Sequence, residues 1–147
     1  MQWLPQFAER FPILKDPPTF GKNGPPIVVA TGFSLNNKPI TAQVDTLFGG
    51  TMLIYPTSVK ELGLTDEAAT PVKQFFKYTD NGVELREARS NIQAFGNRVL
   101  ARHAPLYFAT EGVHLPDGMF DATVGHTLFV HSVLSLDFHD MKVWISD

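Results

Sequence analysis

The sequence predicts an all-β domain with one or two short helices. Twelve Phe and eleven Pro are high counts for 147 residues, and aromatic-rich runs broken by frequent turn residues are typical of β-sheets rather than helices. Apolar residues make up 44% of the chain and charged residues 18%, which is typical of globular proteins. A chain of this length is expected to form one domain with a substantial hydrophobic core.

Composition argues against several classes of function. The net charge is −3 without a block of basic residues, so neither nucleic acid nor a membrane is expected as a partner. The absence of Cys excludes disulfides, thiolate catalysis and cysteine metal sites. No apolar run reaches the length of a membrane span, and the N-terminus lacks a signal-peptide pattern. We therefore expect a soluble protein of unknown compartment, with export by a signal peptide outside these residues left open.

Residues 1–26 are predicted to form an N-terminal extension and linker before the main domain, residues 27–147. Trp3, Phe7 and Phe11 recur at a spacing of four, which predicts a short amphipathic helix. We favour an extension that packs on its own domain over an arm that docks on a partner subunit or covers a groove. Residues 17–26, rich in Pro and Gly, are expected to be a non-helical linker.

The main domain is predicted to begin with a hairpin. Residues 27–35 and 39–45 are apolar extended runs separated by Asn36, Asn37 and Lys38. Asn tolerates the positive φ that tight hairpin turns require. The second strand of this hairpin delivers an acidic residue, Asp45.

Residues 44–64 organise the rest of the chain. A turn of small residues follows Asp45, and an apolar run (52–55) then leads to a short helix (56–64) that stops at Gly63. The small turn residues are Thr46, Gly49, Gly50 and Thr51. An acid that a strand delivers into such a turn is expected to face something other than bulk solvent.

The second half of the chain predicts further hairpins and little helix. The expected strands are 72–78 with 83–88, 90–95 with 99–108, and 133–138 with 141–145; residues 111–121 form a loop and 125–131 a brief helix.

Val44-Asp45-Thr46 and, later in the chain, Thr123-Val124-Gly125 form two short motifs. In this order they resemble the motifs of the retropepsin-like aspartic peptidases of the bacterial type, whose single-lobed subunits each carry one hydrophobic-Asp-Thr/Ser-Gly motif. Val44-Asp45-Thr46 corresponds to the first, and the family's apolar run, Pro, short helix and Leu-Gly-Leu correspond to residues 52–64. In the family, two apolar residues and a Gly open a short C-terminal helix, which Thr123-Val124-Gly125 resembles with Thr in an aliphatic position. The resemblance covers about residues 27–145.

The resemblance implies a single-lobed closed β-barrel that hydrolyses peptide or protein substrates as a homodimer, without a cofactor. Asp45 of each subunit would meet its counterpart across a two-fold axis. At about 3 Å and an effective dielectric near 20, two carboxylates repel by roughly 5 kcal/mol, which keeps one proton on the pair. The ionised carboxylate would activate a water, and the protonated one would polarise the scissile carbonyl.

Other positions take their roles from the same resemblance. Thr46 would join the two loops across the axis, with Leu47 and Gly49 beside it. The second motif contributes Val124 and Gly125. A hairpin tip would form the flap over the substrate, or alternatively an ordinary surface turn; its residues are Tyr78, Thr79, Asp80, Asn81 and Gly82. The C-terminal strand 142–146 and the N-terminal arm are the candidate interface segments.

Leu47 departs from the family pattern, which has Gly at this position. If the position needs positive φ, Leu there costs roughly 1–3 kcal/mol. A second hypothesis therefore keeps the fold without the reaction, as a peptide-binding or scaffolding module. A third hypothesis is a sandwich-type binding domain in which the Asp-Thr sequence is incidental. For Asp45 itself, the alternative to catalysis is a structural carboxylate that caps the turn by accepting hydrogen bonds from the N–H groups of Gly49 and Gly50.

Other catalytic chemistries find little support. His126 and His131 are five residues apart, which does not place two ligands on one helical face. The remaining histidines are scattered, so no metal site is expected. Neither a Gly-x-Ser-x-Gly nor a phosphate-loop or dinucleotide fingerprint occurs in the sequence.

Overall fold

The computed structural model describes residues 9–13, 28–46, 48–64, 70–72, 85–90, 92–109 and 120–147. These residues are mostly β-strand with two short helices, α1 (Pro56–Val59) and the 3-10 helix η3 (His126–Phe129), which confirms the predicted class. The strands are β1 (Arg10–Pro12), β2 (Val29–Leu35), β3 (Lys38–Val44), β4 (Met52–Ile54), β5 (Thr70–Val72), β6 (Leu85–Arg89), β7 (Ile92–Phe95), β8 (Arg98–Arg102), β9 (Pro105–Phe108), β10 (Ala122–Val124), β11 (Val133–Asp137) and β12 (Lys142–Ser146).

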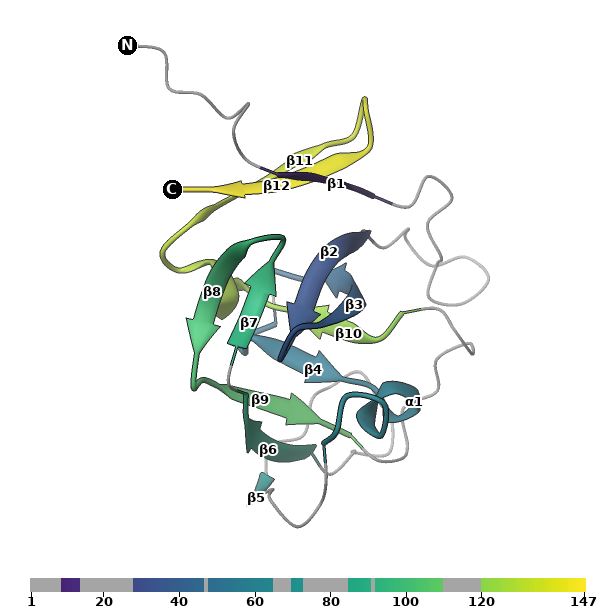
Figure 1. Cartoon of the computed structure of the whole chain (residues 1–147), viewed down its shortest axis with the longest axis vertical. Helices are drawn as coiled ribbons and strands as arrows, with labels where there is room; N and C mark the ends of the chain where they lie inside the picture. The colour runs from purple at the N-terminus through teal and green to yellow at the C-terminus, as the bar shows by residue number, and fades with distance from the viewer. Residues whose placement is uncertain are drawn as a thin grey trace.

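The strands form two sheets (Figure 1). The larger has the order β5-β6-β9-β4-β10-β3-β2-β7-β8, and the smaller has the order β1-β12-β11 and lies across one end of the larger. Closure of the larger sheet into a barrel stays a prediction. Strand β10 lies parallel to β3 and antiparallel to β4, so two segments far apart in sequence meet in the middle of the sheet.

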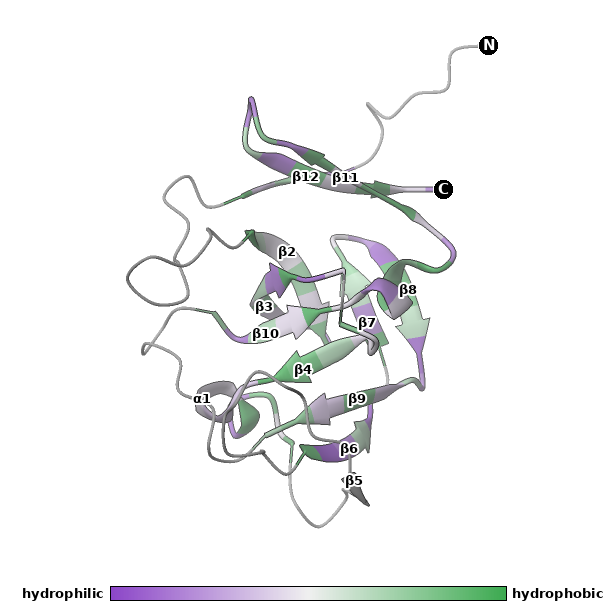
Figure 2. Cartoon of the chain, turned by 180° about the vertical axis from the view of Figure 1, so that it is seen from behind, coloured by the Kyte–Doolittle hydropathy of each residue, from purple (hydrophilic) through white to green (hydrophobic). Residues whose placement is uncertain are grey.

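The β2–β3 hairpin is confirmed. Asn36 and Asn37 have φ of 49° and 66°, the left-handed conformation at both central positions that matches the twist of the flanking strands. The final hairpin is confirmed as well, with β11 and β12 paired from Val133↔Ser146 to Asp137↔Lys142. Hydrophilic residues gather at its turn (Figure 2).

The predicted helix in the N-terminal extension is wrong for Phe11, which lies in β1. This strand pairs with β12, and the Phe11 ring packs on Phe95 with 4.8 Å between centroids. Gly32 leaves room for that ring, because a Cβ on Gly32 would lie 2.6 Å from Phe11 Cδ2. Strand pairing with a distant segment therefore overrides the helical spacing; Trp3 and Phe7 lie outside the described residues.

The single strand predicted over 99–108 is also wrong, because two strands occupy it. His103 has φ of 49°, a left-handed conformation that turns the chain between β8 and β9. Strand β8 pairs with β7, whereas β9 pairs with β6 and β4.

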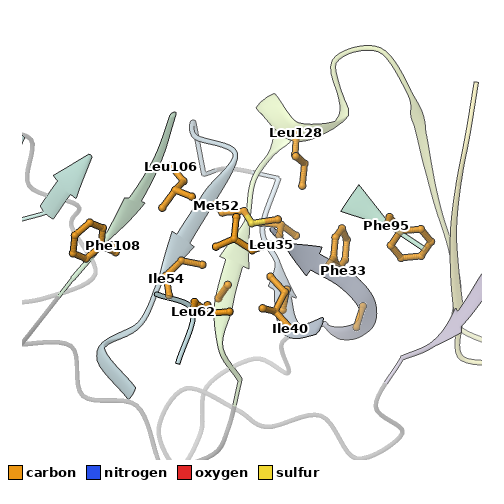
Figure 3. Packing of buried hydrophobic residues seen from close by; sticks show 14 of the residues in the cluster. Phe33, Leu35, Ile40, Met52, Ile54, Leu62, Phe95, Leu106, Phe108 and Leu128 are labelled. Atoms are coloured by element: carbon orange, nitrogen blue, oxygen red, sulfur yellow. The ribbon is translucent and has the colours of Figure 1, made fainter. Parts of the chain in front are cut away.

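The core lies on both faces of the larger sheet. Met52 and Ile54 belong to a main cluster under α1, whereas Leu53 and Tyr55 belong to a second cluster, as the alternation of side chains along a strand requires. Figure 3 shows side chains of β2, β3, β4 and β9 converging in the main cluster. The second cluster consists of Val29, Phe48, Leu53, Tyr55, Leu85, Ala109 and Phe120. No helix in the described part of the chain is long and apolar enough to cross a membrane.

Candidate active site around Asp45

Asp45 directly follows β3 at the point where β10 ends beside it. Val124 lies opposite Val44 in the parallel ladder, and the Asp45 N–H donates to Val124 O at 3.0 Å. Asp45 itself is half-buried. The end of β3 and the second motif are therefore neighbours, although about 80 residues separate them in sequence.

The chain after Asp45 forms a turn that we call the Asp45 loop, residues 45–51; within it, Leu47 lies outside the described residues. The Phe48 N–H donates to Asp45 O at 3.1 Å. The Phe48 side chain is only 2% exposed and packs in the second cluster, while Thr46 and Gly49 are exposed. One aromatic side chain thus anchors the loop in the core.

Residues 125–127 bind four carbonyl groups of the Asp45 loop. The Gly125 N–H donates to Thr51 O at 2.9 Å and the His126 N–H to Phe48 O at 3.2 Å. The His126 ring joins Thr46 O through Nδ1 at 2.9 Å, which fixes Nδ1 as the protonated nitrogen because a carbonyl only accepts. The Thr127 hydroxyl donates to Gly49 O at 2.8 Å. The shape of the loop therefore depends on this second segment.

Gly125 is required at its position by close approach rather than by its backbone angles. Its φ is −113°, which any residue adopts. A Cβ there, however, would overlap the carbonyl oxygens of Phe48 and Gly50 and lie 2.6 Å from Phe48 Cδ1. Only glycine lets the two segments pack this closely.

A buried chain of hydrogen bonds joins β3, β10 and Tyr55, the residue after β4. The Tyr55 hydroxyl lies 2.6 Å from Thr123 Oγ1, and Thr123 Oγ1 donates to Gln43 Oε1 at 3.1 Å. Since Thr123 has one hydroxyl proton, which goes to Gln43, Tyr55 must be the donor to Thr123. This bonding explains Thr at an aliphatic position of the resembled motif, because its hydroxyl satisfies two buried neighbours.

Comparison with known proteins gives a structural likeness only. No family model matches the sequence, and no curated protein matches it. Among solved structures, the chain is similar to a retropepsin-like aspartic protease from Rickettsia conorii. The TM-score is 0.58 at 13% identity, over 95% of this chain and 90% of that one. This chain has a retropepsin-like fold. At this identity the likeness speaks to the fold alone.

Within the retropepsin-like fold, the residues of both predicted motifs meet at one place. Asp45, Thr46 and Gly49 lie on the loop that Gly125 contacts, and Val124 bonds the main chain of Asp45. Leu47 and the predicted flap residues Tyr78, Thr79, Asp80, Asn81 and Gly82 lie outside the described residues.

Sequence reasoning missed the roles of His126, Thr127 and the buried polar chain. The only sequence signal for His126 and Thr127 was their position directly after Gly125 of the second motif. The structure also assigns Asp121 a structural role: its Oδ2 accepts from the Thr41 N–H at 2.8 Å and its Oδ1 from the Ser58 hydroxyl at 2.6 Å. Across the described ranges, no three His, Asp or Glu side chains gather as metal ligands would.

Proposed function

We propose that this protein is an aspartic-type endopeptidase that acts as a homodimer, with Asp45 as the catalytic carboxylate of each subunit. The retropepsin-like fold supports the proposal. A closed barrel and a substrate flap formed by residues 78–82 belong to the same proposal. An extended peptide would bind beneath that flap through strand-like hydrogen bonds.

The observation that carries the proposal is the attachment of the Asp45 loop at both ends to one segment. Asp45 N–H bonds Val124 O at the start of the loop, and Gly125 N–H bonds Thr51 O at its end. A half-buried carboxylate on a loop that is fixed in this way suits general acid–base chemistry, since a preorganised group needs little rearrangement in the transition state.

The reaction needs a second carboxylate, which we assign to Asp45 of the partner subunit. Asp121 is unsuited, because it lies beside Thr41 at the other end of β10 and both of its side-chain oxygens already accept hydrogen bonds from Thr41 and Ser58. Two Asp45 carboxylates at about 3 Å would share one proton. The ionised member takes a proton from the attacking water, while the protonated member donates a hydrogen bond to the scissile carbonyl.

Leu47 favours a second candidate function. Where the resembled motif has Gly, a larger side chain adds bulk beside the paired carboxylates. In that case the fold serves as a peptide-binding or scaffolding module without hydrolysis.

Cleavage of a mixed peptide library between pH 3 and 7 separates the two candidates. The samples are the wild type, Asp45→Asn, and Asp140→Asn as a control that removes an exposed turn carboxylate, each also analysed by sedimentation. We expect a dimeric wild type and Asp140→Asn to cleave, and Asp45→Asn to be inactive. A folded wild type that cleaves no peptide contradicts the enzyme proposal, and Leu47→Gly then tests whether this side chain is the cause.

A further inference from the structure

We propose that Gln43 is a specificity-determining residue that selects substrates with a hydrogen-bond acceptor in the side chain next to the scissile bond. The proposal rests on the proposed function, because it assumes that Asp45 marks the site of cleavage. It adds a substrate class, peptides with Glu, Gln, Asp or Asn beside the cleaved bond.

Gln43 and Asp45 lie on the same face of the sheet. They are two residues apart along β3 and its continuation, and side chains alternate between faces along a strand. Two residues of a strand span about 7 Å, roughly the length of two residues of an extended peptide. A peptide whose scissile bond lies at Asp45 therefore places a neighbouring side chain near Gln43.

The buried chain of hydrogen bonds fixes which end of the Gln43 amide faces inward. Tyr55 donates to Thr123, and Thr123 donates to Gln43 Oε1. The amide oxygen is thus turned toward Thr123, which lies directly opposite Gln43 in the ladder. The Nε2 group, with two N–H donors, points the other way.

The outward Nε2 group has unused donors. No acceptor bonds it among the residues that the structure describes. Gln43 is 9% exposed, and within the same residues the one buried side-chain oxygen or nitrogen that lacks a partner belongs to Gln93. Nε2 therefore keeps contact with solvent. A fixed N–H donor beside the cleavage site favours peptides whose side chain supplies a hydrogen-bond acceptor. A peptide that displaces the water bound to this donor without accepting a hydrogen bond from it binds less well.

Two substitutions at Gln43 distinguish the effect of the Nε2 donors from the effect of side-chain size. Gln43→Met keeps the length of the side chain and removes the donors. Gln43→Glu keeps an oxygen for Thr123 and replaces Nε2 with an acceptor, so it should favour a donor such as Lys. Gln93→Met is the matched control, because Gln93 is fully buried and pairs opposite Leu35, near the other end of β3 from Asp45.

The experiment uses peptides that differ only in one residue flanking the cleaved bond, namely Glu, Gln, Met or Lys. Cleavage by each folded variant is measured at the highest pH at which the wild type is active. Binding of the same peptides at pH 7 is measured with each variant in the Asp45→Asn background. We expect the wild type and Gln93→Met to prefer Glu and Gln over Met by about 3- to 10-fold. Gln43→Met should lose the preference, and Gln43→Glu should shift it toward Lys.

Each outcome supports or overturns at least one of the two proposals. Cleavage without the preference, or with a preference that survives Gln43→Met, overturns the role of Gln43 and leaves the peptidase intact. Binding with the preference but no cleavage supports Gln43 and overturns the peptidase. Absence of both binding and cleavage in folded protein overturns both.

Discussion

Strand β3 has a turn at each end, and the two turns are supported in different ways. At its start, Asn36 and Asn37 form a tight turn with positive φ angles, and Asn36 exchanges two hydrogen bonds with the main chain of Ile92 in β7. At its end, the Asp45 loop receives hydrogen bonds from His126 and Thr127, which lie 78 to 80 residues later in the chain. The first turn is set mainly by the backbone conformation of its own two residues, whereas four carbonyl groups of the second are bonded by the segment that follows β10.

This difference bears on how a reactive group is positioned. A local turn needs only residues with suitable backbone preferences. The Asp45 loop instead combines a core anchor, Phe48, with four carbonyl groups bonded from residues 125–127. Substitutions in these contacts should disturb the surroundings of Asp45, and substitutions at the Asn turn should affect stability alone.

Phe48→Ala should have the largest effect on the loop. Removal of a buried Phe side chain costs about 3–5 kcal/mol in the free energy of unfolding, because a cavity remains. Denaturant unfolding measures this loss, with Phe138→Ala as the control because Phe138 is 60% exposed. Equal losses in the two variants would mean that Phe48 does not anchor the loop.

Gly125→Ala should come next. The added methyl group overlaps the carbonyls of Phe48 and Gly50, and overpacking of this kind costs about 1–3 kcal/mol. Gly49→Ala is the matched control, since among the described residues no atom outside its chain neighbours lies within 4 Å of its Cβ position. Unfolding curves that coincide for the two variants would contradict the close packing of the two segments.

Thr127→Val should have a smaller effect on stability. It removes the hydroxyl that bonds Gly49 O and keeps the shape of the side chain, so we expect a loss of about 0.5–1.5 kcal/mol. Peptide cleavage should fall as well, because the loop loses one of its supports. Thr57→Val, at an exposed position of α1, should change neither quantity; a similar fall in both variants would argue against the role of Thr127.

The smallest effect should come from the Asn turn. Asn37→Ala places a side chain without local hydrogen bonding in a left-handed conformation, which costs an ordinary residue roughly 1–2 kcal/mol. Because Asn already bears part of this cost, the loss should be a fraction of it, whereas Asn37→Gly should be near neutral. Thermal unfolding distinguishes the two variants. Cleavage per folded molecule should be unchanged in both, and a selective loss of cleavage would contradict the separation between the two ends of β3.

The same contrast explains what could be predicted from the sequence. The Asn turn, the strands β2 and β3 and the short helix after Pro56 carry local signals, and all were predicted. The spacing of Trp3, Phe7 and Phe11 predicts a helix, whereas Phe11 pairs with β12, some 130 residues away, and no local pattern reveals that partner. The break between β8 and β9 depends on the left-handed backbone conformation of His103, which a His residue in the sequence does not predict.

For the candidate site, the resemblance of the two motifs predicts Asp45, Val124 and Gly125, and the structure brings these segments together. Their roles stay predictions. The hydrogen bonds of His126 and Thr127 to the loop, and the chain from Tyr55 to Gln43, required the register between β3, β10 and β4. That register is a property of the folded sheet rather than of any single stretch of sequence.

The central claim, a catalytic pair with one Asp45 from each of two copies, is tested most directly by mixing subunits. Wild-type and Asp45→Asn chains are unfolded together in equal amounts and refolded, and peptide cleavage is compared with that of the same total amount of refolded wild type. If both carboxylates of a dimer are needed, about a quarter of the activity remains, because only wild-type pairs are active. Retention of about half would show that each chain acts alone, and would contradict the paired site.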